Sequence, residues 1–235
     1  MGIRTGRALL ESLRDGRWLF IDGEQVRDVT SDPRFAAAAQ ALAELYDMQH
    51  DPALVERMTF LSPASGERVG LSFIEPCSVG DLIRRREMVK IWMDATCGMF
   101  GRSPDFMNIF FTGFASAADE FGRRDKSFAE NVRAYHAHIR DNDICMTHTL
   151  VNPQVDRSKP VEKQDKDLAA KIVKETDAGI VIRGARMVST LCAYAHDLLV
   201  LPSTILPRAR KQSLMPSVSV SRSTRRGCAL SADRR

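Results

Sequence analysis

The sequence lacks the long apolar runs that membrane-spanning and secreted proteins carry. No stretch of about 18 apolar residues occurs, and the N-terminus has no apolar segment that ends in small residues. From these absences we expect neither a membrane helix nor a secretion signal, and we place the protein in the cytoplasm. Its 235 residues, 44% hydrophobic and 27% charged, suffice for one large or two small domains with a buried core.

Cysteine is scarce, and the five cysteines show no pattern. They are odd in number and scattered, and no C-x-x-C pair occurs, so the sequence predicts neither a disulfide framework nor a metal site. We expect most of them to be buried packing residues. They are Cys77, Cys97, Cys145, Cys192 and Cys228.

The excess of positive charge is confined to the end of the chain. Segment 206–235 holds eight Lys or Arg residues and one acid, Asp233, so 26 of the 34 basic and 29 of the 30 acidic residues precede it. The preceding part is therefore slightly acidic, and the tail produces the net charge of +4 and the pI of 8.9. The tail has no aromatic residue and little apolar periodicity, so we expect it to be disordered or an out-of-frame translation.

The first part of the chain is typical of a helical domain. Alanine-rich and amphipathic stretches follow capping residues such as Ser31 and Ser78, and residues 18–26 predict a hairpin around Asp22-Gly23. We expect the apolar faces to include Phe35, Ala39, Leu42 and Leu45 in one helix, and Leu82, Val89 and Trp92 in another. The predicted helices are 5–15, 33 to about 50, 78 to about 98–101, 104–111 and 128–141.

After about residue 145 the pattern predicts strands. Residues 171–190 contain short β-branched runs separated by glycine and aspartate, which is typical of an antiparallel meander, and residues 197–202 predict one more strand. The expected fold class is α+β. We divide the chain into a helical domain with a small hairpin (1–144), an incomplete β domain (145–205) and the basic tail (206–235).

Three local sequences suggest a function. They are GRSPDF (101–106), MTHTLVNPQVDRSKP (146–160) and ETDAGIVIRGARMVST (175–190). In order and spacing they resemble the large-component family of 4-hydroxyphenylacetate 3-hydroxylases, and the resemblance runs from about residue 7 to about 204. It implies an acyl-CoA-dehydrogenase-like architecture whose C-terminal helical bundle is missing here.

The resemblance implies the oxygenase component of a two-component aromatic monooxygenase. Such an enzyme takes reduced FAD from a separate NAD(P)H-flavin reductase and uses molecular oxygen to hydroxylate a phenol beside its OH group. The flavin supplies the reaction, and the protein supplies orientation and electrostatics. The resemblance also implies a homo-oligomer at full length. From the residues themselves we expect neither nucleic acid nor a membrane as a partner.

The family resemblance also implies the site residues. Arg102 and His148 are matched to the residues that meet the phenolic oxygen; a guanidinium favours phenolate, and an imidazole can accept its proton. Phe106 stands where the family commonly has a tyrosine, which leaves the identity of the phenol open. The residues matched to flavin contacts are His148, Thr149, Leu150, Val151, Gln154, Val155, Asp156, Arg157 and Thr190.

Other interpretations stay open. In the related 4-hydroxybutyryl-CoA dehydratases a C-x-x-x-C pair helps to hold an iron–sulfur cluster; Cys97 matches its first cysteine, but Gly101 stands at the second position. A basic nucleic-acid-binding protein is the alternative of another class, although the basic tail lacks aromatic residues for base stacking.

The sequence also predicts the behaviour of the chain by itself. Because we expect the helical bundle to be missing and the β domain to be incomplete, we expect this chain alone to bind FAD weakly, to hydroxylate nothing and to aggregate. We further expect the residues after about Thr204 to be read out of frame.

Overall fold

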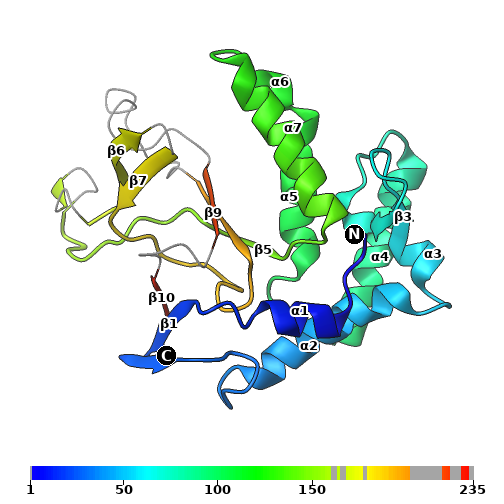
Figure 1. Ribbon diagram of the computed structural model, residues 1–235, viewed down its shortest axis with the longest axis horizontal. Helices are drawn as coiled ribbons and strands as arrows, with labels where there is room; N and C mark the ends of the chain where they lie inside the picture. Colours follow the sequence, from blue (N-terminus) through cyan, green and yellow to red (C-terminus); the bar gives the residue numbers. More distant parts are fainter. Residues whose placement is uncertain are drawn as a thin grey trace.

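The structure is a computed structural model that describes residues 2–159, 163–164, 168–176 and 179–201, together with two later strands, 219–222 and 229–232. In Figure 1 helices α3 to α7 occupy one side of the molecule and strands β5 to β9 the other, while α1 and α2 lie along its base. The helices are α1 (Gly6–Ser12), α2 (Ala36–Asp47), η1 (Met48–His50), α3 (Val55–Met58), η2 (Leu71–Phe73), α4 (Val79–Ala95), α5 (Pro104–Ser116), α6 (Ala118–Phe121) and α7 (Lys126–Asp141). The strands are β1 (Trp18–Ile21), β2 (Glu24–Val26), β3 (Thr59–Leu61), β4 (Arg68–Gly70), β5 (Met146–Thr149), β6 (Lys171–Thr176), β7 (Gly179–Arg183), β8 (Asp197–Val200), β9 (Ser219–Arg222) and β10 (Ala229–Ala232).

The N-terminal elements confirm the local signals in the sequence. The side chain of Thr5 caps α1 by accepting a hydrogen bond from the backbone N–H of Ala8 at 3.1 Å. Strands β1 and β2 pair antiparallel around Asp22 and Gly23, whose φ angles of 51° and 82° are those that a tight hairpin turn requires.

Helix α2 begins three residues later than its predicted start. The carboxylate of Asp32 accepts from the backbone N–H of Arg34 and forms a turn, so the helix begins only at Ala36. The predicted inward face is confirmed, since Ala39, Leu42 and Leu45 are all buried.

Helix α4 shows a capping box at its start. Ser78 accepts from the backbone N–H of Asp81, and the Asp81 carboxylate accepts from the hydroxyl of Ser78. The helix ends at Ala95, before the predicted end, where Cys97 adopts a left-handed φ of 51°. Trp92 is buried as predicted, but Leu82 is 47% exposed, so the predicted face was wrong at that position.

The second part of the chain consists of small sheets, and the α+β class is confirmed. Strands β6 and β7 form the expected antiparallel hairpin. Strands β5 and β8 pair in parallel, which the sequence did not indicate, and β9 lies antiparallel to β8. Strand β10 runs parallel to β1 (Figure 1). Segment 206–235 thus adds two short strands, which we did not expect, while its other residues lie outside the described part.

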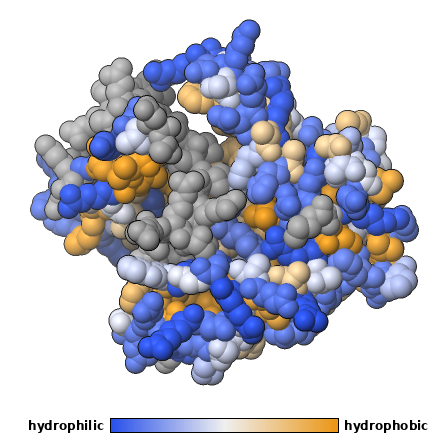
Figure 2. All heavy atoms as spheres, in the orientation of Figure 1, coloured by the Kyte–Doolittle hydropathy of each residue, from blue (hydrophilic) through white to orange (hydrophobic). Residues whose placement is uncertain are grey.

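The surface differs from expectation in its cysteines, and it carries an exposed apolar patch of the kind we expected. Cys145 is buried, but Cys77 and Cys97 are exposed, and Cys228 lies outside the described residues. Apolar side chains gather on the β6–β7 hairpin (Figure 2), where Val173, Ile180, Val181 and Ile182 are exposed. No helix in the described ranges is long and apolar enough to cross a membrane.

Gly6 marks the closest approach between α1 and α2, and we expect Gly6→Ala to destabilise the fold. Its backbone N–H donates to the Asp47 carboxylate at 2.7 Å. A Cβ atom there would lie 2.6 Å from Asp47 Oδ2 and closer still to the Ala43 carbonyl oxygen. Because this forces the helices apart, we expect a loss of about 1–3 kcal/mol in the free energy of unfolding, measured by urea denaturation.

Gly113→Ala is the matched control for Gly6→Ala. Gly113 lies inside α5, where an added Cβ meets nothing within 4 Å. Alanine there should gain roughly 0.5–1 kcal/mol because it loses less backbone entropy on folding. Equal effects of the two substitutions would contradict the close helix packing at Gly6.

Candidate active site

The site begins at the start of α5, where Arg102 lies beside an aromatic ring. Pro104 occupies the first turn of the helix, a position that suits its fixed φ. Phe106 follows within this turn, so the chain folds Arg102 back over it. The guanidinium carbon of Arg102 lies 4.3 Å from the centre of the Phe106 ring, within the range of a cation–π contact.

His148 reaches the same ring from β5. Its neighbours Thr147 and Thr149 are buried, while the His148 side chain is half-buried. The His148 ring centre lies 5.4 Å from that of Phe106, with the planes inclined at 41°. The structure therefore brings together Arg102, Phe106 and His148, although His148 lies more than 40 positions after the other two. We call these three residues the Arg102–His148 cluster.

The environment of His148 favours the neutral imidazole. Burial lowers its pKa below the usual 6.5, and the positive charge of Arg102 lowers it further. The ring is thus unprotonated at neutral pH and can accept a proton or a hydrogen bond.

The cluster continues into an aromatic row that the sequence analysis missed. Phe106 stacks on Phe110 at 6.2 Å with a plane angle of 16°, and Phe110 meets Phe114 at 4.8 Å. The spacing of four residues places these rings on one side of α5, and this spacing could have predicted the row from the sequence. The row extends the aromatic surface from Phe106 along α5.

The two segments predicted to contact a flavin are joined to each other. Thr149 Oγ1 donates to the Met187 carbonyl at 2.8 Å, and the Met187 backbone N–H donates to the Val151 carbonyl at 2.9 Å. Thr147 Oγ1 also donates to the Thr190 carbonyl, which places Thr190 beside β5. Thr190 lies in a turn rather than in the strand we predicted.

The remaining predicted flavin residues, 154–157, form an exposed turn. Asp156 accepts from the Ser158 hydroxyl at 2.6 Å and pairs with Lys159 at 2.9 Å. The hydrogen bonds from Ser158 and Lys159 lower the pKa of Asp156. Gln154, Val155 and Arg157 are exposed. No interaction ties this turn to the Arg102–His148 cluster in the described residues, so its flavin role stays a prediction.

Two buried polar atoms near Leu150 have no hydrogen-bond partner among the residues that the structure describes. They are Asn152 Oδ1, an acceptor, and Arg186 Nε, a donor. The other end of the Arg186 side chain donates to the Leu150 carbonyl at 3.4 Å, and burial lowers its pKa. Buried polar atoms of this kind are costly unless a ligand or water satisfies them. Nothing in the sequence indicates Arg186, which stands in a strand-like segment without a distinguishing neighbour.

Comparison with known proteins decides the family. The family described as 4-hydroxyphenylacetate 3-hydroxylase N terminal matches residues 5–224. The chain belongs to this family. The match extends beyond residue 204, where we expected the resemblance to end. The origin of the tail stays a prediction.

The relatives are longer than this chain. The 4-hydroxyphenylacetate 3-monooxygenase oxygenase component of Thermus thermophilus is 43% identical over 205 residues, which cover 86% of this chain and 41% of the relative. A crystal structure of such an oxygenase component, complexed with FAD and 4-hydroxyphenylacetate, superposes with a TM-score of 0.85 at 39% identity. The superposition covers 94% of this chain and 45% of that one. The chain thus spans less than half the length of the proteins it matches.

The dehydratase alternative shares the fold. An archaeal 4-hydroxybutyryl-CoA dehydratase from N. maritimus matches with a TM-score of 0.78 and 22% identity, over 96% of this chain and 44% of that one. This likeness shows the acyl-CoA-dehydrogenase-like fold and nothing about activity. No group of three or more His, Cys, Asp or Glu residues in the described ranges is placed to hold a metal ion.

Proposed function

We propose that this protein is the N-terminal part of an oxygenase component that hydroxylates a phenol beside its OH group. It would use molecular oxygen and reduced FAD from a separate reductase, as a homo-oligomer at full length. The observation that carries the proposal is the Arg102–His148 cluster, in which a cation and a neutral imidazole flank one aromatic ring at 4.3 and 5.4 Å.

The cluster suits the activation of a phenol. A phenol with a pKa of about 10 is protonated at neutral pH, whereas the phenolate has the more electron-rich ring. The guanidinium of Arg102 stabilises the phenolate oxygen, and a ring nitrogen of His148 accepts the proton. The low pKa of His148 keeps this nitrogen free to do so.

The substrate class follows from Phe106 and the aromatic row. Where the family commonly has a tyrosine, Phe106 offers only ring carbons and so cannot hydrogen-bond the phenol. Phe110 and Phe114 continue the apolar surface. We therefore propose a phenol whose remaining substituents are apolar.

The residues near Leu150 fit FAD. When bound, FAD supplies the chemistry that activates oxygen. The unpartnered Asn152 Oδ1 and Arg186 Nε are the kind of buried acceptor and donor that a polar cofactor satisfies. We propose that segments 148–151 and 154–157, Thr190, Asn152 and Arg186 hold it.

A hybrid enzyme tests the proposal. Residues 1–201 of this chain would replace the matching part of the Thermus thermophilus relative, and the purified hybrid would receive reduced FAD and oxygen. We expect a catechol from para-alkyl or para-halogen phenols, detected by chromatography, with the unaltered relative as the control. A folded hybrid that binds FAD but forms no catechol from any phenol tested would contradict the proposed function.

A further inference from the structure

Segment 189–196 carries Thr190, one of the residues proposed to hold FAD, and leads into β8. Inside it, the backbone N–H groups of Tyr194 and Ala195 donate to the Leu191 carbonyl at 2.8 and 2.9 Å, which makes a tight turn. Leu191 adopts a left-handed φ of 68°, which residues other than glycine rarely adopt. A backbone of this kind keeps its shape only where its surroundings hold it.

A buried guanidinium holds the segment from one side. Arg17 Nη1 donates to the carbonyl oxygens of Ala193 at 2.9 Å and of Ala195 at 3.0 Å. The other two nitrogens of the guanidinium donate to the Asp15 carboxylate at 2.9 and 2.6 Å, which balances the charge. Arg17 is only 5% exposed, so these bonds are shielded from water. Hydrogen bonds from a charged donor are about twice as strong as neutral ones, and the planar fork of arginine fixes their directions.

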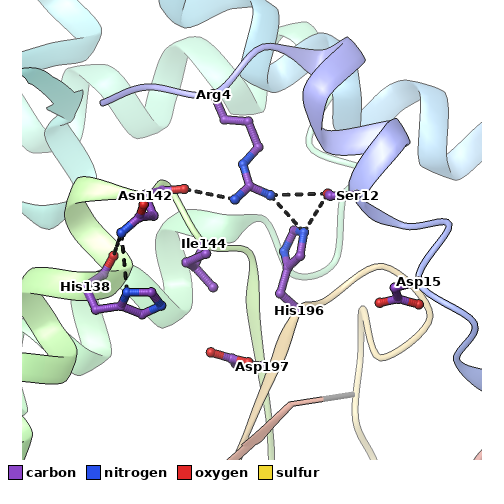
Figure 3. A pocket seen from close by; sticks show the side chains of 8 residues that line it. All are labelled: Arg4, Ser12, Asp15, His138, Asn142, Ile144, His196 and Asp197. Atoms are coloured by element: carbon purple, nitrogen blue, oxygen red, sulfur yellow. Dashed lines mark hydrogen bonds between the residues drawn. The ribbon is translucent and has the colours of Figure 1, made fainter. Parts of the chain in front are cut away.

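Residues before Arg17 hold the end of the same segment. Figure 3 shows Arg4 and Ser12 facing the His196 ring, whose Nε2 atom lies 2.8 Å from Arg4 Nη1 and 2.7 Å from Ser12 Oγ. Asp15, the partner of Arg17, lines the same cavity of about 260 Å³ (Figure 3). The N-terminal part of the chain thus contacts this segment at more than one point.

Strand β5 holds the start of the segment. The Thr147 hydroxyl donates to the Thr190 carbonyl and lies 3.3 Å from the Ser189 hydroxyl. Thr190 itself is exposed, so its side chain is accessible to a ligand. The backbone of Thr190 is therefore held by β5 on one side and, through the turn, by Arg17 on the other.

We propose that Arg17 is a positioning residue for the flavin and acts through the carbonyl oxygens of Ala193 and Ala195. By fixing these two atoms, it sets where Thr190 stands relative to β5 and therefore relative to the cofactor. Asp15 orients the guanidinium and supports the same role. The inference rests on the proposed function, in which Thr190 contacts FAD, and it adds the residues that give Thr190 its place.

Loss of the Arg17 bonds should loosen the segment without unfolding the protein. Tyr194 packs in the buried cluster of α1, α2 and the β1–β2 hairpin, and its hydroxyl donates to the Phe35 carbonyl at 3.1 Å. Removing Arg17 alone would leave the Asp15 carboxylate without its cation, which is destabilising in itself. The test variant therefore combines Asp15→Asn with Arg17→Gln, so that neither charge is left unpaired.

Hydrogen–deuterium exchange of the full 235-residue chain tests the hold on the segment without flavin. In the double variant, the backbone amides of 189–196 should exchange about 10-fold faster or more, because a hydrogen bond from a charged donor is worth roughly that factor. The amides of α7 should keep their rate. Arg14→Gln, at an exposed arginine paired with Asp28, is the matched control and should change neither rate. Unchanged exchange in 189–196, or an equal rise in α7, would overturn the positioning role.

The affinity of the hybrid enzyme for FAD tests whether this hold reaches the flavin. The double variant should raise the dissociation constant about 10-fold, and Arg17→Lys, which keeps the charge but not the fork, should raise it less. Thr190→Ala should also weaken binding. Combined with the double variant it should add little, because both changes act through one residue.

The outcomes separate this inference from the proposed function. An unchanged affinity in the double variant, or losses that simply add when Thr190→Ala is combined with it, would overturn the role of Arg17. A hybrid that binds FAD but forms no catechol contradicts the proposed function alone, since its affinity still reports on Arg17. A folded hybrid that binds no FAD would overturn both.

Discussion

Replacing Arg102 or His148 by alanine is expected to lower coupled hydroxylation about 10²-fold or more in the hybrid enzyme, while flavin oxidation continues as peroxide release. Arg102→Ala removes the cation that stabilises the phenolate, and His148→Ala removes the proton acceptor. The loss at His148 has the size of a typical acid–base contribution, and the loss at Arg102 has the size expected when one group that stabilises a developing charge is removed. The measurement is catechol formed per flavin oxidised. Arg123→Ala, at an exposed arginine paired with Glu120, is the matched control.

The pH profile separates a chemical role of His148 from a structural one. Because the pKa of His148 lies below 6.5, hydroxylation should be full at neutral pH and fall as the pH decreases through that lowered value. This acidic limb should disappear in His148→Ala. In Arg102→Ala it should move to higher pH, because a like charge that lowered the pKa is gone. Full coupled activity in both alanine variants would remove the proposed roles.

Much of the site could be predicted because its signals are local. GRSPDF and HTLVNPQVDR each carry their residues within a few positions, and the structure brings Arg102, Phe106 and His148 together. Helix α1 and the β1–β2 hairpin could likewise be predicted, the helix from its capping residue and the hairpin from its turn residues. Such features depend on neighbours along the chain, which a single sequence displays.

The features that could not be predicted depend on partners far apart in the sequence. The parallel pairing of β5 with β8 joins Met146 to Asp197, and nothing near either residue specifies it. The contact of Arg4 with His196 is of the same kind, because these residues meet only after folding. Arg186 Nε lacks a hydrogen-bond partner among the described residues, and this can be seen only in the folded structure.

Trp92→Ala is expected to cost about 3–5 kcal/mol in the free energy of unfolding. Trp92 is 1% exposed and packs in a cluster of buried residues with Leu45, Met58, Leu71 and Met88. Its indole N–H donates to the Leu45 carbonyl at 2.9 Å, which joins α4 to α2. Alanine would leave a cavity and remove that bond, so urea denaturation should show a much lower midpoint.

Leu82→Ala, on the same helix, is the control that distinguishes the structure from the sequence pattern. The amphipathic pattern places Leu82 and Trp92 on one inward face and so predicts a large loss at both positions. In the structure Leu82 is 47% exposed, because the first turns of α4 extend beyond the cluster that Trp92 fills. We therefore expect Leu82→Ala to cost less than about 1 kcal/mol. Comparable losses for the two variants would show that the start of α4 is covered in solution and that its described packing is wrong.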